Sequence, residues 1–183
     1  MQLQVRAVPR VLSLLPMRRS SVSLAVLAIS VAIIGCEQLT ATTTPSGSQP
    51  QVRVTRVVDG DTIAVRLDGR TEKVRYIGMD TPETVKPNSP VECFGKAASE
   101  ENKRLVDGRK VTLQFDVERR DRYDRLLAYV RLADGTMVNE TLLRRGYATT
   151  LTIPPNVRYA SRFRKAQREA REAGRGLWRA CAT

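Results

Sequence analysis

Two short acidic segments hold the side chains that could do chemistry. The first is DGDT at residues 59–62, and the second is DTPET at residues 80–84. Each segment alone is compatible with an ordinary turn or the end of a strand. Together they place Asp61, Asp80 and Glu83 at the ends of neighbouring strands, where carboxylate oxygens can converge on one cation. Hard oxygen ligands of this kind suit Ca²⁺, or Mg²⁺ with more water.

Two arginines accompany these acids. Arg75 lies five residues before Asp80, in what the pattern predicts to be the same strand, and Arg125 closes the segment RRDRYDR at residues 119–125. Guanidinium groups bind phosphate oxygens through paired hydrogen bonds and stay charged at any working pH. A metal ion, a carboxylate base and two arginines are what phosphodiester cleavage requires, namely an activated water and stabilisation of growing negative charge. Arg75 could also serve as a structural ion-pair partner of Asp80 or Glu83.

The composition removes several other reaction classes. The 183 residues contain no histidine, so serine–histidine and cysteine–histidine catalysis are excluded. Three cysteines without histidine are too few for a four-ligand zinc site in one chain. Any metal site must therefore consist of oxygen ligands.

The chain is strongly basic. Lys and Arg number 31 against 19 Asp and Glu, which gives a formal net charge of +12. Removing residues 1–35 takes away four arginines and no acid, which leaves 27 basic and 19 acidic residues and a net charge of +8. This charge favours a polyanionic partner, either nucleic acid or an anionic lipid surface, without choosing between them.

The N-terminal region has the order of a secretory signal. Residues 1–35 begin with a basic region, continue with an apolar run from Val22 to Gly35, and precede Cys36. The end of this run, IIGC, resembles the lipobox of bacterial lipoproteins, in which the cysteine after the cleavage site receives the lipid. The 14 residues of the run fall short of the roughly 20 that span a membrane. We therefore expect an exported protein held at a membrane, on its periplasmic or cell-surface face, by lipidated Cys36; soluble secretion and a membrane anchor are the alternatives.

A tether and one folded domain follow this signal. Residues 36–50 are polar and rich in Thr, Ser and Pro, a composition typical of a flexible tether. Residues 51–183 are expected to form a single domain, because domains commonly contain about 100–200 residues. Once Cys36 is lipidated, Cys93 and Cys181 remain as an even pair in an oxidising compartment, and we expect them to form a disulfide. A reactive thiol is disfavoured because no histidine could activate it.

Hydrophobic periodicity predicts five strands and three helices in this domain. Apolar and polar residues alternate from Val52 onward, and further strands are expected over residues 63–67, 73–79, 111–117 and 126–132. Helical spacing covers residues 95–106, 137–145 and 159–173. Five short strands with inserted helices indicate a small α+β domain built on a barrel.

Four segments, in order, resemble a known family. They are VVDGDT at residues 57–62, RYIGMDTPET at residues 75–84, DRYDRLLAYV at residues 121–130 and MVNE at residues 137–140. Together they resemble the thermonuclease family, typified by staphylococcal nuclease, over residues 54–178. The resemblance implies a five-stranded OB-fold β-barrel with about three helices. It also implies a Ca²⁺-dependent nuclease that acts on DNA and RNA and leaves 3′-phosphate products.

The resemblance further implies a metal site and a base. Aspartates at the positions of Asp61 and Asp80 bind the calcium ion in that family, together with the backbone carbonyl at the position of Thr81. The glutamate at the position of Glu83 contacts the attacking water and is usually regarded as the general base. All four residue types are present in this sequence.

Substrate contacts are implied in the same way. Arginines at the positions of Arg75 and Arg125 bind the scissile phosphate, and the tyrosine at the position of Tyr123 lies against the nucleotide. Arg122 belongs to the same run of basic and aromatic residues, a combination that fits a surface for phosphates and bases. It is therefore a further candidate for substrate binding.

The sequence departs from the family at two places. A second pair of tyrosines in the family falls near Leu151 and Ile153 here, so a base-stacking contact is expected to be lost. Gly78 and Met79 replace bulkier apolar residues beside Asp80. The first departure concerns nucleotide preference and leaves the hydrolytic residues intact.

A non-catalytic module that binds nucleic acid or an anionic surface is the competing interpretation, since fold does not fix function. Binders of this fold tend to lose the acids or the arginines, and none is missing here, which favours the enzyme. The basic residues between positions 158 and 171 are interpreted by default as a solvated helix face. No protein partner is inferred, and a monomer is expected.

Overall fold

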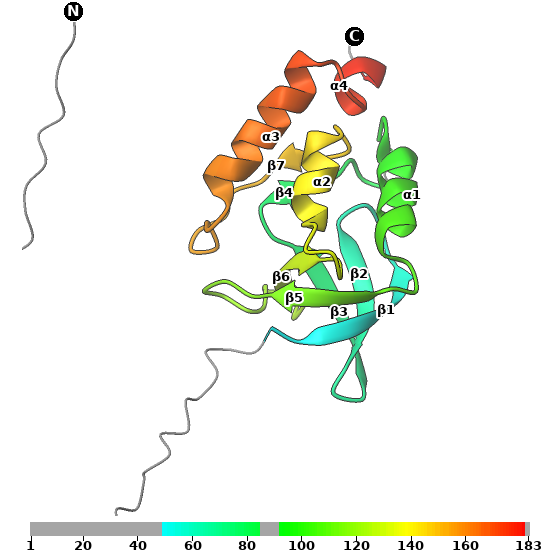
Figure 1. The fold of residues 1–183 in the computed structure, drawn as a ribbon, viewed down its shortest axis with the longest axis vertical. Helices are drawn as coiled ribbons and strands as arrows, with labels where there is room; N and C mark the ends of the chain where they lie inside the picture. The colour runs from blue at the N-terminus through cyan, green and yellow to red at the C-terminus, as the bar shows by residue number, and fades with distance from the viewer. Residues whose placement is uncertain (1–48, 85–91, 182–183) are drawn as a thin grey trace, which may run out of the picture. The chain divides into compact units, whose positions relative to one another are not determined.

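Five strands close into a barrel in the computed structural model, which describes residues 49–84 and 92–181 (Figure 1). The strands are β1 Gln51–Val57, β2 Thr62–Leu67, β3 Arg70–Tyr76, β5 Lys110–Gln114 and β6 Leu126–Arg131. Their order is β1-β2-β3-β6-β5, and all neighbours are antiparallel except β3 and β6. The expected α+β fold on a five-stranded barrel is confirmed. The signal peptide, Cys36 and the tether up to residue 48 lie outside the described residues.

Alternating side chains fill the interior of the barrel. Buried residues come from successive strands, namely Val54, Ile63, Val65, Val74 and Leu113. Because neighbouring side chains of a strand point to opposite faces, the residues between them face outward. A slip of one residue would exchange the two faces, so the apolar pattern also sets the register.

A turn separates β3 from a further short strand. Strand β4, Met79–Asp80, pairs with β7, Thr149–Thr150, in a two-stranded sheet. Gly78 lies between β3 and β4 with a φ of 81°, and a Cβ there would lie 2.7 Å from an aromatic ring of a later helix. Only glycine accepts both conditions without strain. The expectation of one strand over residues 73–79 is therefore wrong, and the turn folds Asp80 back toward β3.

Three helices of seven residues or more lie on one side of the barrel in the described part of the chain (Figure 1). They are α1 Gly95–Val106, α2 Val138–Arg144 and α3 Ala160–Glu172, and a short α4, Leu177–Ala180, follows. Helix α2 packs against both α1 and α3. The sequence did not predict α4, because four residues are too few to show a helical period.

A buried amide joins α2 to the barrel. Asn139 on α2 is fully buried, and its Oδ1 accepts a hydrogen bond of 2.9 Å from the backbone N–H of Val130 on β6. Its Nδ2 donates to the backbone carbonyl of Ile77 at 3.0 Å. Ile77 directly precedes the Gly78 turn. The side chain of Asn139 therefore holds that turn against both the helix and the barrel.

Strand β5 ends earlier than the alternation predicted. The apolar period continues to Val117, but the strand stops at Gln114, and Val117 is 69% exposed. Asn156 exchanges two hydrogen bonds with the backbone of Glu118, one of 2.8 Å from the Glu118 N–H and one of 2.9 Å to its carbonyl. These tertiary contacts replace the ladder bonds that a longer strand would make, and a local pattern carries no signal of them.

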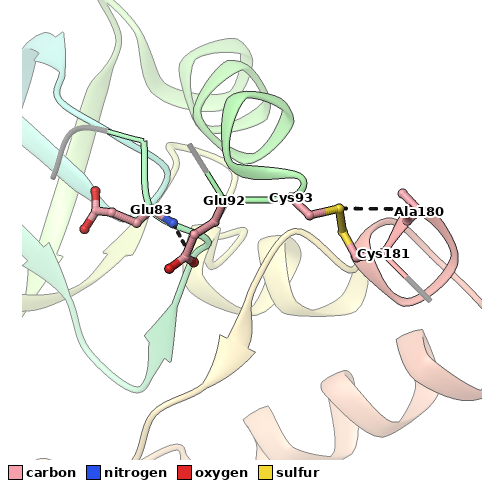
Figure 2. The surroundings of a disulfide bond; sticks show 5 residues. All are labelled: Glu83, Glu92, Cys93, Ala180 and Cys181. Atoms are coloured by element: carbon pink, nitrogen blue, oxygen red, sulfur yellow. Dashed lines mark hydrogen bonds between the residues drawn. A yellow bond between two sulfur atoms is a disulfide. The ribbon is translucent and has the colours of Figure 1, made fainter. Parts of the chain in front are cut away.

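A disulfide joins the segment before α1 to the segment after α4. Cys93, just before α1, is bonded to Cys181, just after α4, with their Cα atoms 6.0 Å apart (Figure 2). The bridge joins positions 88 residues apart in the sequence.

Among the described residues, no helix has the length and apolar character needed to cross a membrane.

Candidate active site

The turn between β1 and β2 brings Asp61 against the segment that follows β4. A Cβ at Gly60 would lie 2.6 Å from Thr81 Oγ1, so glycine is needed for this close approach. Asp61 is 5% exposed, and its Oδ2 accepts hydrogen bonds from the backbone N–H and the hydroxyl of Thr81, both 3.0 Å long. Its Oδ1 accepts from the hydroxyl of Thr62 at 3.0 Å. The Asp61 carboxylate is therefore fixed in orientation by the protein itself.

Arg75 connects the two acidic segments. Its Nη1 lies 2.8 Å from Asp61 Oδ2, and its Nη2 lies 2.5 Å from Asp80 Oδ1. Nη1 also donates to the backbone carbonyl of Met79 at 3.1 Å. The side chain of Arg75 is largely buried, whereas half of the Asp80 side chain is exposed. Two aspartates from separate segments thus converge on a single positive charge.

The acids around Arg75 repel one another. Burial and the nearby Asp61 carboxylate raise the pKa of Asp59 to about 6. Burial also raises the pKa of Asp80, with the charge of Asp61 adding to the effect and that of Arg75 opposing it. A cation bound among these carboxylates would relieve the repulsion and lower both pKa values.

The donor chemistry of this cluster fits a hard cation. The carboxylates of Asp61 and Asp80 border one cavity and offer oxygen atoms, the type of ligand that Ca²⁺ and Mg²⁺ prefer. In residues 49–84 and 92–181, no group of three or more acidic, histidine or cysteine side chains is arranged to hold a metal ion. Water must therefore complete the coordination of any cation bound by these two carboxylates.

Glu83 lines the same hollow as the aspartates. This cavity, of about 290 Å³, is also lined by Arg75, Glu92 and Arg125. One carboxylate oxygen of Glu83, Oε1, accepts a hydrogen bond of 3.0 Å from the backbone N–H of Thr84. A carboxylate, two guanidinium groups and the acidic cluster therefore border one space that a phosphodiester could enter.

Arg125 is held by the loop that precedes β6. Its Nε donates to Asp121 Oδ2 at 2.8 Å. Asp121 Oδ1 accepts hydrogen bonds from the backbone N–H groups of Tyr123 and Arg125, at 2.9 and 3.0 Å. Burial opposes the charge of Asp121, but these hydrogen bonds outweigh it and lower its pKa below the usual value. The loop conformation and the position of Arg125 are thus set by the same carboxylate.

A second cavity, of about 530 Å³, adjoins this site, and Arg75 and Arg125 line both cavities. Tyr123 lies on its rim, 65% exposed, with the guanidinium carbons of Arg122 and Arg125 at 4.8 and 5.4 Å from its ring centre. Arg122 also donates to the Tyr123 hydroxyl at 2.7 Å. An exposed ring between two guanidinium groups suits stacking with a base and contact with a phosphate.

Part of the lining of the second cavity is aliphatic. Leu151 and Ile153 line it and are 40% and 60% exposed. These are the two positions at which the family resemblance led us to look for tyrosines. They offer an apolar surface without an aromatic face, so stacking here depends on Tyr123.

The structure places every candidate residue of the folded domain at one of these two cavities, apart from the disulfide cysteines. Those at the acidic cavity are Asp61, Arg75, Asp80, Thr81, Glu83 and Arg125. Arg122 and Tyr123 lie at the second cavity, and Cys36 is outside the described residues. Sequence reasoning assigned Asp59 to a turn and gave no role to Glu92. A lone glutamate nine positions after Glu83 matches no motif, so only tertiary contact identifies Glu92.

Comparison with known proteins identifies the family. Residues 73–180 match the family model described as staphylococcal nuclease homologue. The thermonuclease of Staphylococcus hyicus is 44% identical over 133 residues, which cover 73% of this chain and 78% of that protein. The thermonuclease of Staphylococcus intermedius is 40% identical over 167 residues, 88% of this chain and 99% of that protein. Endonuclease YncB of Bacillus subtilis is 44% identical over 146 residues, 78% of this chain and 69% of that protein.

The matched region contains the barrel strands β6 and β5, all of the helices, and the segments around Asp80 and Arg125. This family model matches more than half of the chain, agrees with the closed five-stranded barrel, and includes three of the four sequence segments, at residues 75–84, 121–130 and 137–140. The chain belongs to the staphylococcal nuclease family.

Proposed function

We propose that this protein is a Ca²⁺-dependent nuclease that hydrolyses phosphodiester bonds of DNA and RNA. Family membership, with relatives named thermonuclease and endonuclease, makes the chain a nucleic-acid hydrolase. One observation carries the finer proposal. Asp61 and Asp80 converge on Arg75 in a cavity that Glu83 and Arg125 also line. This set combines a cation site, a base and two groups that bind phosphate.

Asp61, Asp80 and the backbone carbonyl of Thr81 would hold the Ca²⁺. When bound, the ion supplies charge neutralisation at the phosphate and makes a bound water more acidic. The hydrogen bonds from Thr81 to Asp61 support this role, because they keep the carboxylate oriented toward the neighbouring acid segment. The raised pKa values of Asp59 and Asp80 support it as well, since burial and, after it, the neighbouring Asp61 charge disfavour their ionised forms, which a bound cation would stabilise.

The side chains around the cation site carry out the remaining steps. Glu83 orients the attacking water and accepts its proton as general base. Arg75 and Arg125 donate hydrogen bonds to the phosphoryl oxygens, on which negative charge increases during attack. Attack at phosphorus breaks the bond between phosphorus and the 5′ oxygen. The products are a 3′-phosphate and a 5′-hydroxyl. Tyr123 and Arg122 hold the adjacent nucleotide in the larger cavity.

The protein acts outside the cytoplasm in this proposal. The Cys93–Cys181 disulfide supports export, because such bonds persist in oxidising compartments. Residues 1–35 direct the export, lipidated Cys36 holds the enzyme at the membrane, and residues 36–50 tether the nuclease domain to it. The substrates are then nucleic acids outside the cell membrane.

The deciding experiment is fluorescence release from a quenched single-stranded DNA substrate, with Ca²⁺, with Mg²⁺ and with excess chelator. We expect cleavage that requires Ca²⁺ and stops in chelator. A Glu83→Gln, Arg125→Ala double variant should lose about 10³-fold or more of the activity. A matched Glu100→Gln, Arg168→Ala variant, altered at two exposed positions outside the cavities, should keep it.

Two results would overturn the proposal. Full activity of the Glu83→Gln, Arg125→Ala protein would remove both the base and the phosphate-binding assignment. Folded protein that binds DNA in a salt-sensitive manner and cleaves it with neither metal would favour the binding module.

A further inference from the structure

We propose that Glu92 is a positioning residue for Glu83 and that the Cys93–Cys181 disulfide keeps Glu92 in place, an inference that rests on the proposed function. Two hydrogen bonds join Glu83 and Glu92. The backbone N–H of Glu83 donates to Glu92 Oε2 at 3.0 Å (Figure 2). The backbone N–H of Glu92 donates to the carbonyl of Glu83, also at 3.0 Å. Glu92 thus binds both polar groups of the backbone that carries the proposed base.

The first residue of α1, Gly95, lies close to the same backbone. A Cβ at Gly95 would lie 2.9 Å from the carbonyl oxygen of Glu83 and 3.1 Å from that of Pro82. The backbone N–H of Gly95 donates to the carbonyl of Glu92 at 3.0 Å. Phe94 between them has a φ of 70°, so the chain reverses tightly from Glu92 into the helix. A displacement of Glu92 would therefore change how α1 supports Glu83.

The disulfide anchors the residue next to Glu92. Glu92 and Cys93 are both exposed, so packing contributes little to holding them. Cys181 follows α4, which is itself fixed by a 2.8 Å hydrogen bond from the Leu177 N–H to the carbonyl of Gly146. The Cys93 sulfur also lies 3.8 Å from the carbonyl of Ala180, a contact without a hydrogen bond because a bridged sulfur has no proton. The covalent bond thus ties the segment of Glu92 to a fixed corner of the fold.

Two roles for the Glu92 carboxylate can be separated. Glu92 lines the acidic cavity, so its negative charge could act directly on a bound cation. A positioning role requires only an oxygen that accepts the Glu83 N–H. Glu92→Gln keeps an acceptor oxygen and removes the charge, whereas Glu92→Ala removes both. The pair of variants therefore distinguishes positioning from electrostatics.

The test measures kcat and KM on single-stranded DNA at saturating Ca²⁺, and the amide hydrogen exchange of Glu83 without substrate. We expect Glu92→Ala to lower kcat about tenfold or more with KM within about twofold, because a shifted base misaligns the attack. Exchange at the Glu83 N–H should become about tenfold faster. Glu92→Gln should stay within about threefold of wild type in both measurements, and Glu100→Ala serves as control. A loss in Glu92→Gln equal to that in Glu92→Ala would overturn the inference, as would unchanged exchange.

The disulfide is tested by a double-mutant cycle. Cys93→Ser, Cys181→Ser protein, shown by melting to be folded at the assay temperature, should lose kcat and protection of the Glu83 N–H in the same direction. The triple variant that also carries Glu92→Ala should lose no more kcat in total than Glu92→Ala alone, since both changes act through one contact. A bridge that only stabilises the fold would lower Tm, leave kcat unchanged and give additive effects, which would refute the link.

Glu83→Gln in the same assay separates this inference from the proposed function. If Glu83→Gln retains full activity, the proposed function itself is wrong. If Glu83→Gln is inactive while Glu92→Ala and Glu92→Gln both match wild type, only the positioning role is wrong.

Discussion

The two cavities that share Arg75 and Arg125 differ in the side chains that line them. Around the acidic cavity, side chains are bound to each other and to the backbone, as Asp61 is to Thr81 and Arg75 to Asp80. Each of those contacts joins segments that the fold brings together. The acidic cavity therefore presents a fixed arrangement before any substrate arrives, which is what stabilisation of developing charge requires.

The larger cavity differs in having a partly apolar lining. Tyr123, Leu151 and Ile153 line part of it, and they are 65%, 40% and 60% exposed. The two aliphatic side chains have no polar group that could fix them, whereas Tyr123 is bound through its backbone N–H to Asp121 and through its hydroxyl to Arg122. Stacking on a base needs an apolar or aromatic face and little directional precision. In the proposed mechanism, hydrolysis therefore depends on residues that contact one another and cannot change independently, whereas nucleotide recognition can be altered one residue at a time.

The largest stability effect is expected at the Gly78 turn, which lines the larger cavity. Gly78→Ala should lower the free energy of unfolding by roughly 3 kcal/mol, because a positive φ and a Phe163 ring 2.7 Å from the new Cβ both oppose it. Gly69→Ala is the matched control: its φ is +75° but nothing lies within 4 Å, so roughly 1 kcal/mol is expected. Urea denaturation measures both. Equal destabilisation would show that contact with α3 does not hold the turn.

The raised pKa of Asp59 in the acidic cavity should make the stability of the protein depend on pH. The pKa of Asp59 is raised from 3.8 to about 6, so the unfolded chain releases this proton first and stability is lost as the pH rises between these values. In chelator, Asp59→Asn should stabilise the protein by roughly 1–3 kcal/mol above pH 6 and have little effect below pH 4. Denaturation at several pH values measures this. Saturating Ca²⁺ should shrink the gain, and an equal gain at pH 4 and pH 7 would contradict the explanation.

Substitutions in the larger cavity should have smaller effects. Tyr123→Ala should raise KM about tenfold with kcat almost unchanged, because loss of one stacking contact costs about 1–3 kcal/mol. Tyr123→Phe, which keeps the ring, should remain near wild type. Leu151→Tyr should lower KM several-fold by adding a second aromatic face. Steady-state kinetics on single-stranded DNA measure all three, and a large fall in kcat for Tyr123→Ala would erase the distinction between the cavities.

Much of the fold followed from local patterns. The alternation through Ile63 and Val65 and the helical spacing from Gly95 to Val106 predicted elements that the structure contains. Local patterns failed where distant segments decide. Val117 continues the alternation, yet the strand has already ended, because Asn156 binds the backbone of Glu118. Gly78 interrupts a pattern that otherwise predicted one strand.

The site shows the same division. Residue types and spacing were enough to select Asp61, Asp80 and Glu83 together with the two arginines. They could not show that Arg75 bridges both aspartates, because that contact depends on a turn between Arg75 and Asp80. The importance of Glu92 was equally hidden, since its partner is a backbone N–H.

The sequence by itself determined which chemistry is available, because side-chain type sets charge, ligand hardness and the absence of a histidine base. It also determined which faces of the strands close the barrel, because burial follows a period of two. Tertiary structure alone decided which acids share Arg75, and that the Cys93–Cys181 bridge holds the segment that binds Glu83. The disulfide and the Arg75–Asp61 pair join segments distant in the chain, whereas Arg75 and Asp80 are five residues apart and Glu83 and Glu92 nine. In both cases the geometry exists only once the barrel has closed and the helices have packed.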